Sequence, residues 1–146
     1  MSTLRLLERV HGHLGWLAVV ALLHPVVLLR KTKRRARLAV ALTTSLVVVT
    51  ASLGAGIYPD YRTRLKQRVF IEAPSWGWAF ERKEHLAVAA VAFALVGCVA
   101  HFVAPSMPDG ARERVARTAH LAYVVAFAFA LVVACIGVAV ASFKSF

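Results

Sequence analysis

Long apolar runs separated by short polar segments set the pattern of this chain. They predict helices over residues 4–29, 38–57, 84–104 and 112–142, and the third helix starts at residue 75 if the aromatic segment before it is also helical. Each run suffices to cross the hydrocarbon core of a bilayer, which takes about 20 helical residues. The connections are short, so consecutive helices are expected to be antiparallel. The sequence therefore predicts an all-α integral membrane protein, an up-and-down four-helix bundle forming a single domain over residues 1–146.

Prolines and turn residues mark the expected helix ends. Pro59 is expected to end the second helix near residue 57, because proline cannot continue the ladder of backbone hydrogen bonds. Pro105 and Pro108 close the third helix in the same way. Asp109 and Gly110 then supply a turn and a cap before the fourth helix.

The segment over residues 61–72 combines four basic residues with apolar ones and fits a short helix at the membrane surface. Trp76, Trp78 and Phe80 follow it, and aromatic residues of this kind anchor helices at the interface between lipid and water. The simpler reading of this segment is a plain anchored loop.

Composition excludes an ordinary soluble domain. Hydrophobic residues make up 60% of the 146 residues and the mean hydropathy is +0.68. The length leaves room for about four spans, which excludes a large transporter fold within this chain. The formal net charge of +11 comes from basic residues in the connections, where lipid head groups and topology explain them without nucleic acid. Cys98 and Cys135 lie in separate apolar runs and form neither a disulfide framework nor a paired metal motif.

The density of basic residues predicts the orientation. Residues 30–37 hold six of them, and Arg112, Arg114 and Arg117 follow the third helix, so these two connections are expected in the cytoplasm. The opposite side carries an equal number, but spread over longer segments and mixed with acidic residues. Both termini are therefore expected on the periplasmic face of a cell inner membrane. The six basic residues also indicate that the first run is a retained span and not a cleaved signal peptide.

The six histidines are the most informative residues, because ionisable side chains within a span are costly and by default mark a function. On the predicted topology the outer half holds His11, His13 and His85, and the inner half holds His24, His101 and His120. His13 and His24 are eleven positions apart, which places them within roughly 20° of each other around a helix and about 16 Å apart along it. Two haems, one in each leaflet, would require imidazoles stacked along one face in this way.

This placement of His11 or His13, His24, His85, His101 and His120 resembles the small four-helix membrane cytochromes b, the group that includes the cytochrome b561 and superoxide oxidase families. The resemblance implies two b haems held between antiparallel helices by histidine ligands. His13 and His85 would then ligate the outer iron, and His24 and His101 the inner one, with His11 and His120 as alternatives. His85 and His101 lie roughly 160° apart around an ideal helix, so both face one seam only if the third helix bends or begins irregularly.

Ligation of each haem iron by two histidines would imply a function in electron transfer. Two histidines leave the haem iron no open position, which favours electron transfer over oxygen chemistry. The resemblance implies quinol or quinone as the partner in the lipid, a periplasmic redox protein or superoxide as the other partner, and a quinone-linked oxidoreductase as the class of enzyme.

Acidic residues overlap the outer histidines. Glu8 and His11 are three positions apart on the first helix, and Glu81, Glu84 and His85 stand at the start of the third. Salt bridges with Arg5, Arg9 and Arg82 are one interpretation. Glu84 and His85 could instead accept protons from a quinol. The third interpretation is a non-haem metal site formed by Glu8, His11, Glu81 and Glu84. The second and fourth helices, however, offer no carboxylate at that depth.

Two other classes of protein remain open from the sequence. One is a haem-free accessory subunit that packs its glycine- and alanine-rich helices against a larger membrane complex. The other is a permease or other membrane protein that binds non-haem metal. An absorption spectrum of the purified protein separates the haem protein from both, because only the haem protein is red.

Overall fold

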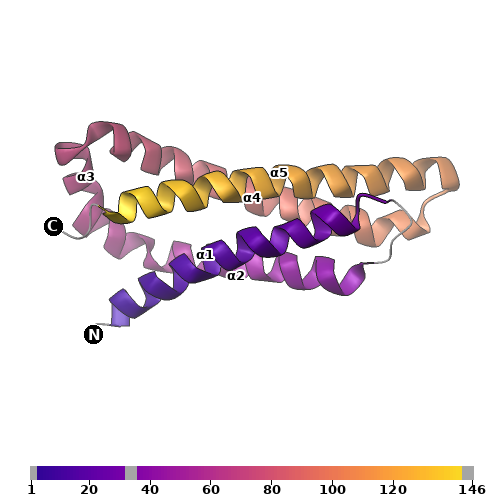
Figure 1. Ribbon diagram of the computed structural model, residues 1–146, viewed down its shortest axis with the longest axis horizontal. Helices are drawn as coiled ribbons and strands as arrows, with labels where there is room; N and C mark the ends of the chain where they lie inside the picture. The colour runs from indigo at the N-terminus through magenta and orange to yellow at the C-terminus, as the bar shows by residue number, and fades with distance from the viewer. Residues whose placement is uncertain (1–2, 32–35, 143–146) are drawn as a thin grey trace.

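Helices make up the described structure. The computed structural model describes residues 3–31 and 36–142. In chain order, its elements are α1 (Thr3–Leu28), α2 (Arg37–Tyr61), the π-helical turn η1 (Arg62–Lys66), α3 (Gln67–Glu72), α4 (Pro74–Val103), the 3-10 turn η2 (Ala104–Ser106) and α5 (Asp109–Ser142) (Figure 1). Within these residues there is no strand, and four helices, α1, α2, α4 and α5, are long and apolar enough to cross a membrane. The predicted all-α membrane four-helix bundle is thus confirmed.

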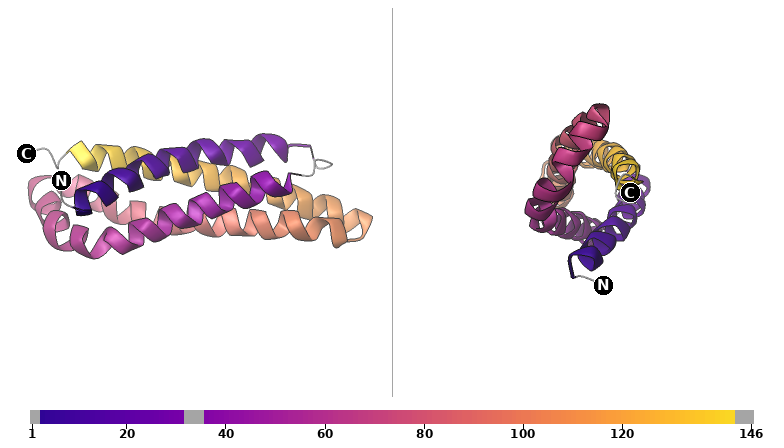
Figure 2. Two further views of the ribbon diagram at one scale, coloured as in Figure 1. Left: turned by 90° about the horizontal axis from the view of Figure 1, so that it is seen from below. Right: turned by 90° about the vertical axis from the view of Figure 1, so that its left-hand side faces the viewer.

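The long helices occupy the corners of an elongated bundle. α1 and α4 each pack against both α2 and α5, so α1 lies diagonally opposite α4, and α2 lies diagonally opposite α5 (Figure 2). The start of α1, the end of α5 and the short helix α3 lie together at one end, called here the terminal end (Figure 1). The end of α1, the start of α2 and the turn between α4 and α5 lie at the other end, called here the loop end.

α2 ends later than predicted, because it continues past Pro59 to Tyr61. Proline removes one backbone donor, and Pro59 is exposed near the end of the helix, where water and head groups can bond to the freed carbonyl. The π-helical turn follows directly, and the Thr63 hydroxyl donates to the carbonyl oxygens of Pro59 and Asp60 at 3.2 and 3.1 Å. A proline at the membrane surface therefore does not stop this helix.

α3 folds back against the start of α4. Pro74 occupies the first turn of α4, where a missing backbone N–H costs nothing, so the third span takes up the earlier of its two expected starts. A Cβ atom on Gly77 would stand 2.7 Å from the ring of Phe70, which shows how closely α3 approaches. The rings of Phe70 and Trp78 meet edge to face with centroids 5.7 Å apart. The segment over residues 61–72 is thus helical, so of the two interpretations of this segment the helix describes it.

Small residues bring α4 and α5 together. A Cβ atom on Gly97 would stand 2.8 Å from Cδ2 of Tyr123 and 3.2 Å from the carbonyl oxygen of Ala119, so a larger residue requires a shift of the helices. Ala94 and Ala126 are completely buried in the same core. Close packing of this kind holds helices together in lipid, where the hydrophobic effect does not.

Tyr123 fills the centre of the bundle. Its side chain is completely buried, as are those of Leu22 on α1 and Val40 on α2. The hydroxyl groups of Tyr123 and Thr44 share a hydrogen bond of 2.6 Å, and the Tyr123 hydroxyl lies 3.5 Å from the carbonyl oxygen of Val40. Because α5 and α2 are diagonal partners, this bond crosses the interior.

A second polar contact compensates for Pro25, which is buried inside α1. Proline has no N–H, so the carbonyl of Ala21, four residues earlier, loses its usual helical donor. The hydroxyl of Thr43 on α2 donates to this carbonyl at 3.3 Å. A buried carbonyl in lipid requires such a partner, so α2 completes the hydrogen bonding of α1.

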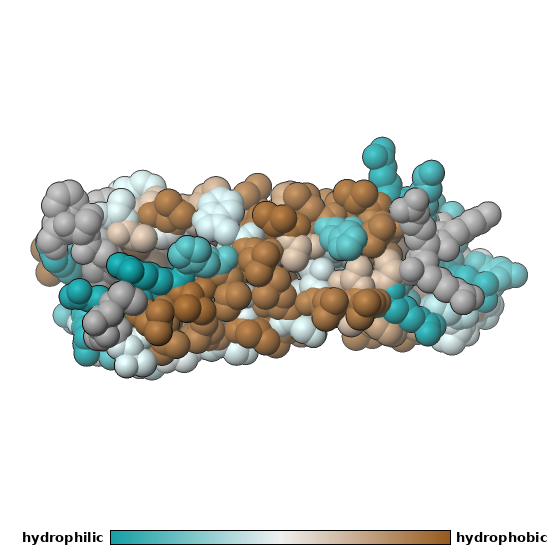
Figure 3. Space-filling model, turned by 60° about the horizontal axis from the view of Figure 1, so that its bottom comes forward, coloured by the Kyte–Doolittle hydropathy of each residue, from teal (hydrophilic) through white to brown (hydrophobic). Residues whose placement is uncertain are grey.

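The surface fits a bilayer. Apolar residues cover the middle of the face in Figure 3, and polar residues gather at its two ends. Large apolar side chains are exposed on every span, among them Val27, Leu38, Val88 and Val138. Exposed apolar surface on this scale marks contact with lipid, so the chain is a multi-pass membrane protein.

The bond between Tyr123 and Thr44 can be tested by a double-mutant cycle. Tyr123→Phe and Thr44→Val should each lower the free energy of unfolding by about 1 kcal/mol, because each leaves the other hydroxyl in the apolar core without this bond. The double variant should lose clearly less than the sum. Reversible unfolding in mixed micelles measures these values, with Thr118→Val on the exposed side of α5 as the control. Strictly additive losses would contradict the coupling.

Candidate functional site

The histidines lie near both ends of the bundle. Towards the terminal end are His11, His13 and His85, and towards the loop end are His24, His101 and His120. They differ in burial, because His13, His24 and His85 are exposed and the other three are half-buried.

His13 and His85 face outwards. Nδ1 of His13 donates to the carbonyl of Arg9 at 2.7 Å, and Nδ1 of His85 donates to the carbonyl of Glu81 at 2.9 Å, each one turn earlier in its own helix. α1 and α4 lie at opposite corners, so the structure does not bring these two rings together in the interior. The outer ligand pair expected from the sequence is therefore not assembled here.

His11 joins α1 to α2. Its Nδ1 donates to the carbonyl of Thr50 at 3.1 Å, across the two helices. The ring fits against Gly54, where an added Cβ atom would stand 2.7 Å from Cε1 of the imidazole. In this arrangement His11 performs a packing and hydrogen-bonding role.

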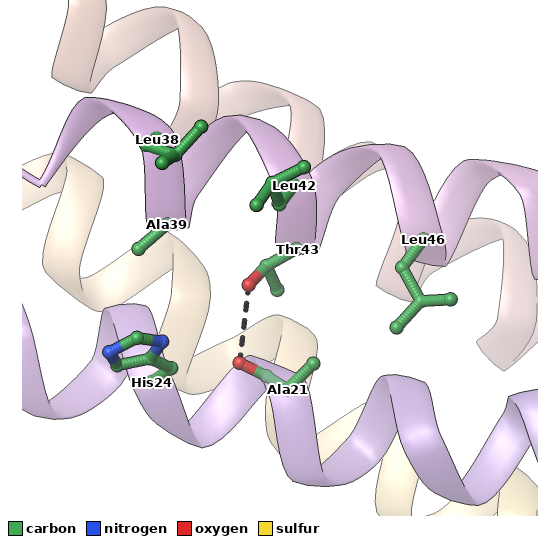
Figure 4. Close-up of a pocket in the computed structure, with 7 residues that line it drawn as sticks. All are labelled: Ala21, His24, Leu38, Ala39, Leu42, Thr43 and Leu46. Atoms are coloured by element: carbon green, nitrogen blue, oxygen red, sulfur yellow. Dashed lines mark hydrogen bonds between the residues drawn. The ribbon is translucent and has the colours of Figure 1, made fainter.

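His101 and His120 are the histidines with unpartnered buried nitrogens. Nε2 of His101 and Nδ1 of His120 are shielded from solvent and have no hydrogen-bond partner within the described residues. The two lie on α4 and α5, which are neighbours, in the same half of the bundle. His24 is in that half too, but it lies beside a groove between α1 and α2, away from α4 (Figure 4). His101 and His120 therefore lie on neighbouring helices, whereas His101 and His24 lie on diagonally opposite ones.

A cluster of polar side chains stands at the terminal end, and we call Tyr58, Lys66, Glu81 and Glu84 the Glu84 cluster. The hydroxyl of Tyr58 donates to Oε2 of Glu84 at 3.2 Å, and Nζ of Lys66 donates to the Tyr58 hydroxyl at 3.5 Å. Lys66 also forms an ion pair with Glu81. The other carboxylate oxygen of Glu84, Oε1, is buried and has no hydrogen-bond partner among the described residues.

Charge and packing hold this cluster together. The hydrogen bond with the Glu81 carboxylate raises the pKa of Lys66 above its ordinary value, so Lys66 is a cation at neutral pH. Tyr61 stacks on Phe80 with ring centroids 4.5 Å apart, and Nζ of Lys83 lies 4.7 Å from the centre of the Phe80 ring. The carboxyl group of Glu84 therefore lies next to the Tyr58 hydroxyl and near the cations Lys66 and Lys83 at the membrane surface.

The sequence pointed to Glu81 and Glu84 but not to Tyr58 or Lys66. Glu81 pairs with Lys66 of the interfacial segment, a partner that the expected salt bridges with Arg5, Arg9 and Arg82 did not include. The available signal was the dense basic run over residues 62–68, opposite the acidic start of the third helix. Pairing the two segments by charge would have found this contact.

The acidic and histidine side chains do not form a non-haem metal centre. Among the described residues, no group of three or more histidine, cysteine, aspartate or glutamate side chains is placed to hold a metal ion. Glu8, His11, Glu81 and Glu84 are thus not gathered as such a site requires.

A haem between two helices requires axial ligands that face the interior and space beside them. His13 and His85 face away from the interior, so the terminal half does not fit a bis-histidine haem in this arrangement. In the loop half, the unpartnered nitrogens of His101 and His120 have the chemistry of axial ligands. The chemistry of the residues therefore fits the group in that half alone, where the completely buried Tyr123, Leu22 and Val40 fill the adjoining interior.

Comparison of the chain with protein-family models, with curated proteins and with solved structures found no match. The fold and the placement of individual side chains are therefore the basis for any functional conclusion.

Proposed function

We propose that this chain is a membrane electron-transfer protein that binds haem b and exchanges electrons and protons with quinol or quinone. The observation that carries the proposal is the pair of buried ring nitrogens on His101 and His120. A buried polar atom without a partner is costly in a bilayer, and a bond to iron would remove that cost at both rings. Ligation by two histidines suits electron transfer, since it leaves no open coordination position.

His101 and His120 are the ligands that this geometry favours, in place of His101 with His24. When bound, haem supplies one-electron chemistry that side chains cannot. A second haem between His13 and His85 stays a prediction from the resemblance to the small membrane cytochromes b. It requires both rings to turn from the surface into the interior.

The Glu84 cluster serves as the proton acceptor for a quinol oxidised at the terminal end, whose electrons would pass to the second haem, because His101 lies 17 residues, about 25 Å, further along α4. Oxidation of a quinol releases protons, and the carboxylate of Glu84 has one buried oxygen available to receive one. The Tyr58 hydroxyl orients the Glu84 carboxylate by donating to Oε2. Lys66 donates to the Tyr58 hydroxyl, and its positive charge stabilises the ionised form of Glu84. His85, next to Glu84 in the chain, stands at the surface and could pass the proton to solvent.

A second candidate function is that of a haem-free subunit of a larger membrane complex. The completely buried Tyr123, Leu22 and Val40 support it, because the interior is packed without a cofactor. In that case the exposed His13, His24 and His85 would belong to the lipid-facing or partner-facing surface.

Haem content decides between the two functions. We expect protein purified after expression with ample haem supply to show a sharp α-band on reduction. His101→Ala and His120→Ala should each remove the haem of the loop half, because each removes one axial ligand, whereas Thr118→Ala on the exposed side of α5 should retain it. Pyridine haemochrome analysis of His13→Ala measures the second haem. Colourless wild-type protein would refute haem binding and favour the subunit.

Glu84→Gln tests the proton acceptor. The amide keeps the size of the carboxyl group and its contact with Tyr58 but cannot take up a proton. We expect slower quinol-dependent reduction, by roughly ten- to a hundredfold, with unchanged haem content. Glu72→Gln, an exposed carboxylate paired with Arg68 at the same end, is the matched control. Equal rates in the two variants would contradict proton transfer by Glu84 and leave the Glu84 cluster with a structural role.

The orientation forms part of the proposal, with the terminal end in the periplasm and the loop end in the cytoplasm of a cell inner membrane. The dense basic run over residues 30–37 supports it. We expect tags on both termini of the chain to be cleaved by protease added to right-side-out vesicles. Protection of both tags would reverse the orientation and leave the bundle unchanged.

A further inference from the structure

A groove opens on the outer surface between α1 and α2, in the half of the bundle near the loop end (Figure 4). Its volume is about 330 Å³, and its walls are apolar apart from two side chains. The lining residues are Ala21, His24, Leu38, Ala39, Leu42, Thr43 and Leu46. Leu38 and Leu42 are 72% and 61% exposed, so the groove faces the lipid.

Of the two polar side chains in the groove, Thr43 and His24, only the imidazole of His24 is available to bind a ligand. The hydroxyl of Thr43 is already bonded to the carbonyl of Ala21 and ties the two helices together across the groove (Figure 4). The imidazole of His24 stands beside Ala39 and makes no hydrogen bond to another described residue. An apolar chain that carries a hydrogen-bond acceptor near one end would match both properties.

Positive charge surrounds the end of the groove. Arg30 and Lys31 follow the end of α1, which forms one wall of the groove, and both are exposed. The guanidinium of Arg37 instead lies over the Phe102 ring of α4, 5.9 Å from the ring centre. The connection over residues 30–37 contains six basic residues, and no acidic residue occurs in the sequence between Glu8 and Asp60. This charge is therefore not compensated by neighbouring residues in sequence, and it calls for an anion at the membrane surface.

We propose that the groove is a binding site for an anionic phospholipid. One acyl chain lies along Leu38, Leu42 and Leu46, and the phosphate binds to Arg30 and Lys31. Nε2 or Nδ1 of His24 donates to an ester carbonyl between them. A quinone would fill the apolar part but brings no anion for the basic residues, so the charge favours the phospholipid.

Native mass spectrometry of the full chain tests this site, with added phosphatidylglycerol or phosphatidylcholine of the same acyl chains. We expect wild-type protein to retain phosphatidylglycerol roughly tenfold more than phosphatidylcholine, because the anionic head group meets two basic side chains. Arg30→Gln with Lys31→Gln should abolish this preference. Arg114→Gln, an exposed residue at the same end on α5, should preserve it.

A second variant tests the groove without altering charge. Ala39→Phe places a ring where the acyl chain lies and should lower retention of phosphatidylglycerol at least fivefold, whereas Val138→Phe on the exposed surface of α5 should not. Circular dichroism and a single elution peak establish that each variant is folded.

Three outcomes would overturn the proposal. These are equal retention of the two lipids by wild-type protein, an unchanged preference in the charge variant together with unchanged retention of phosphatidylglycerol in the groove variant, and occupation of the groove by a quinone or by a second copy of the chain. None of these measurements involves haem, so the outcome is independent of the proposed electron transfer.

Discussion

The hydrogen bond of the Tyr123 hydroxyl crosses the interior of the bundle, and the packing of the helices depends on it. The bond to Thr44 joins diagonal helices, which otherwise have little direct contact, and sets the position of α5 relative to α2. The tyrosine ring needs the space left by Gly97, so the close approach of α4 and α5 follows from the same side chain. Tyr123 also separates the interior into two parts, the half with the Glu84 cluster and the half with His101 and His120.

Polar groups in this protein are satisfied mainly by their own helix or by a neighbouring one. His13 and His85 bond to carbonyls one turn away, and His11 bonds to α2. Such bonds reduce the cost of an imidazole near lipid. Oε1 of Glu84 and the ring nitrogens of His101 and His120 differ, since they are buried without such a bond within the described residues. That difference separates the side chains with an evident structural role from those available for chemistry.

Hydropathy was sufficient to predict the spans, because a bilayer requires long apolar helices and little else produces them. It was insufficient to predict which face of each helix points inwards. Helix geometry places His13 and His24 on one face, and both are indeed exposed, but the buried stripe of α1 is formed by Ala18, Leu22 and Pro25. The two histidines lie roughly 120–140° around the helix from Ala18. Small side chains decided the rotation, since close packing drives association in lipid. The hydropathy pattern also could not predict contacts of the interfacial segment, such as Lys66 with Glu81, because these depend on how the segment folds back against α4.

The Pro25 site has a consequence for how the chain enters the membrane. α1 by itself would carry the carbonyl of Ala21 into the hydrocarbon without its helical donor, and Thr43 of α2 supplies the replacement. α1 is thus an incomplete span until its successor is present. Insertion of α1 and α2 as a helical hairpin avoids that intermediate, which makes the first pair of helices the natural unit of assembly, to which α4 and α5 are then added.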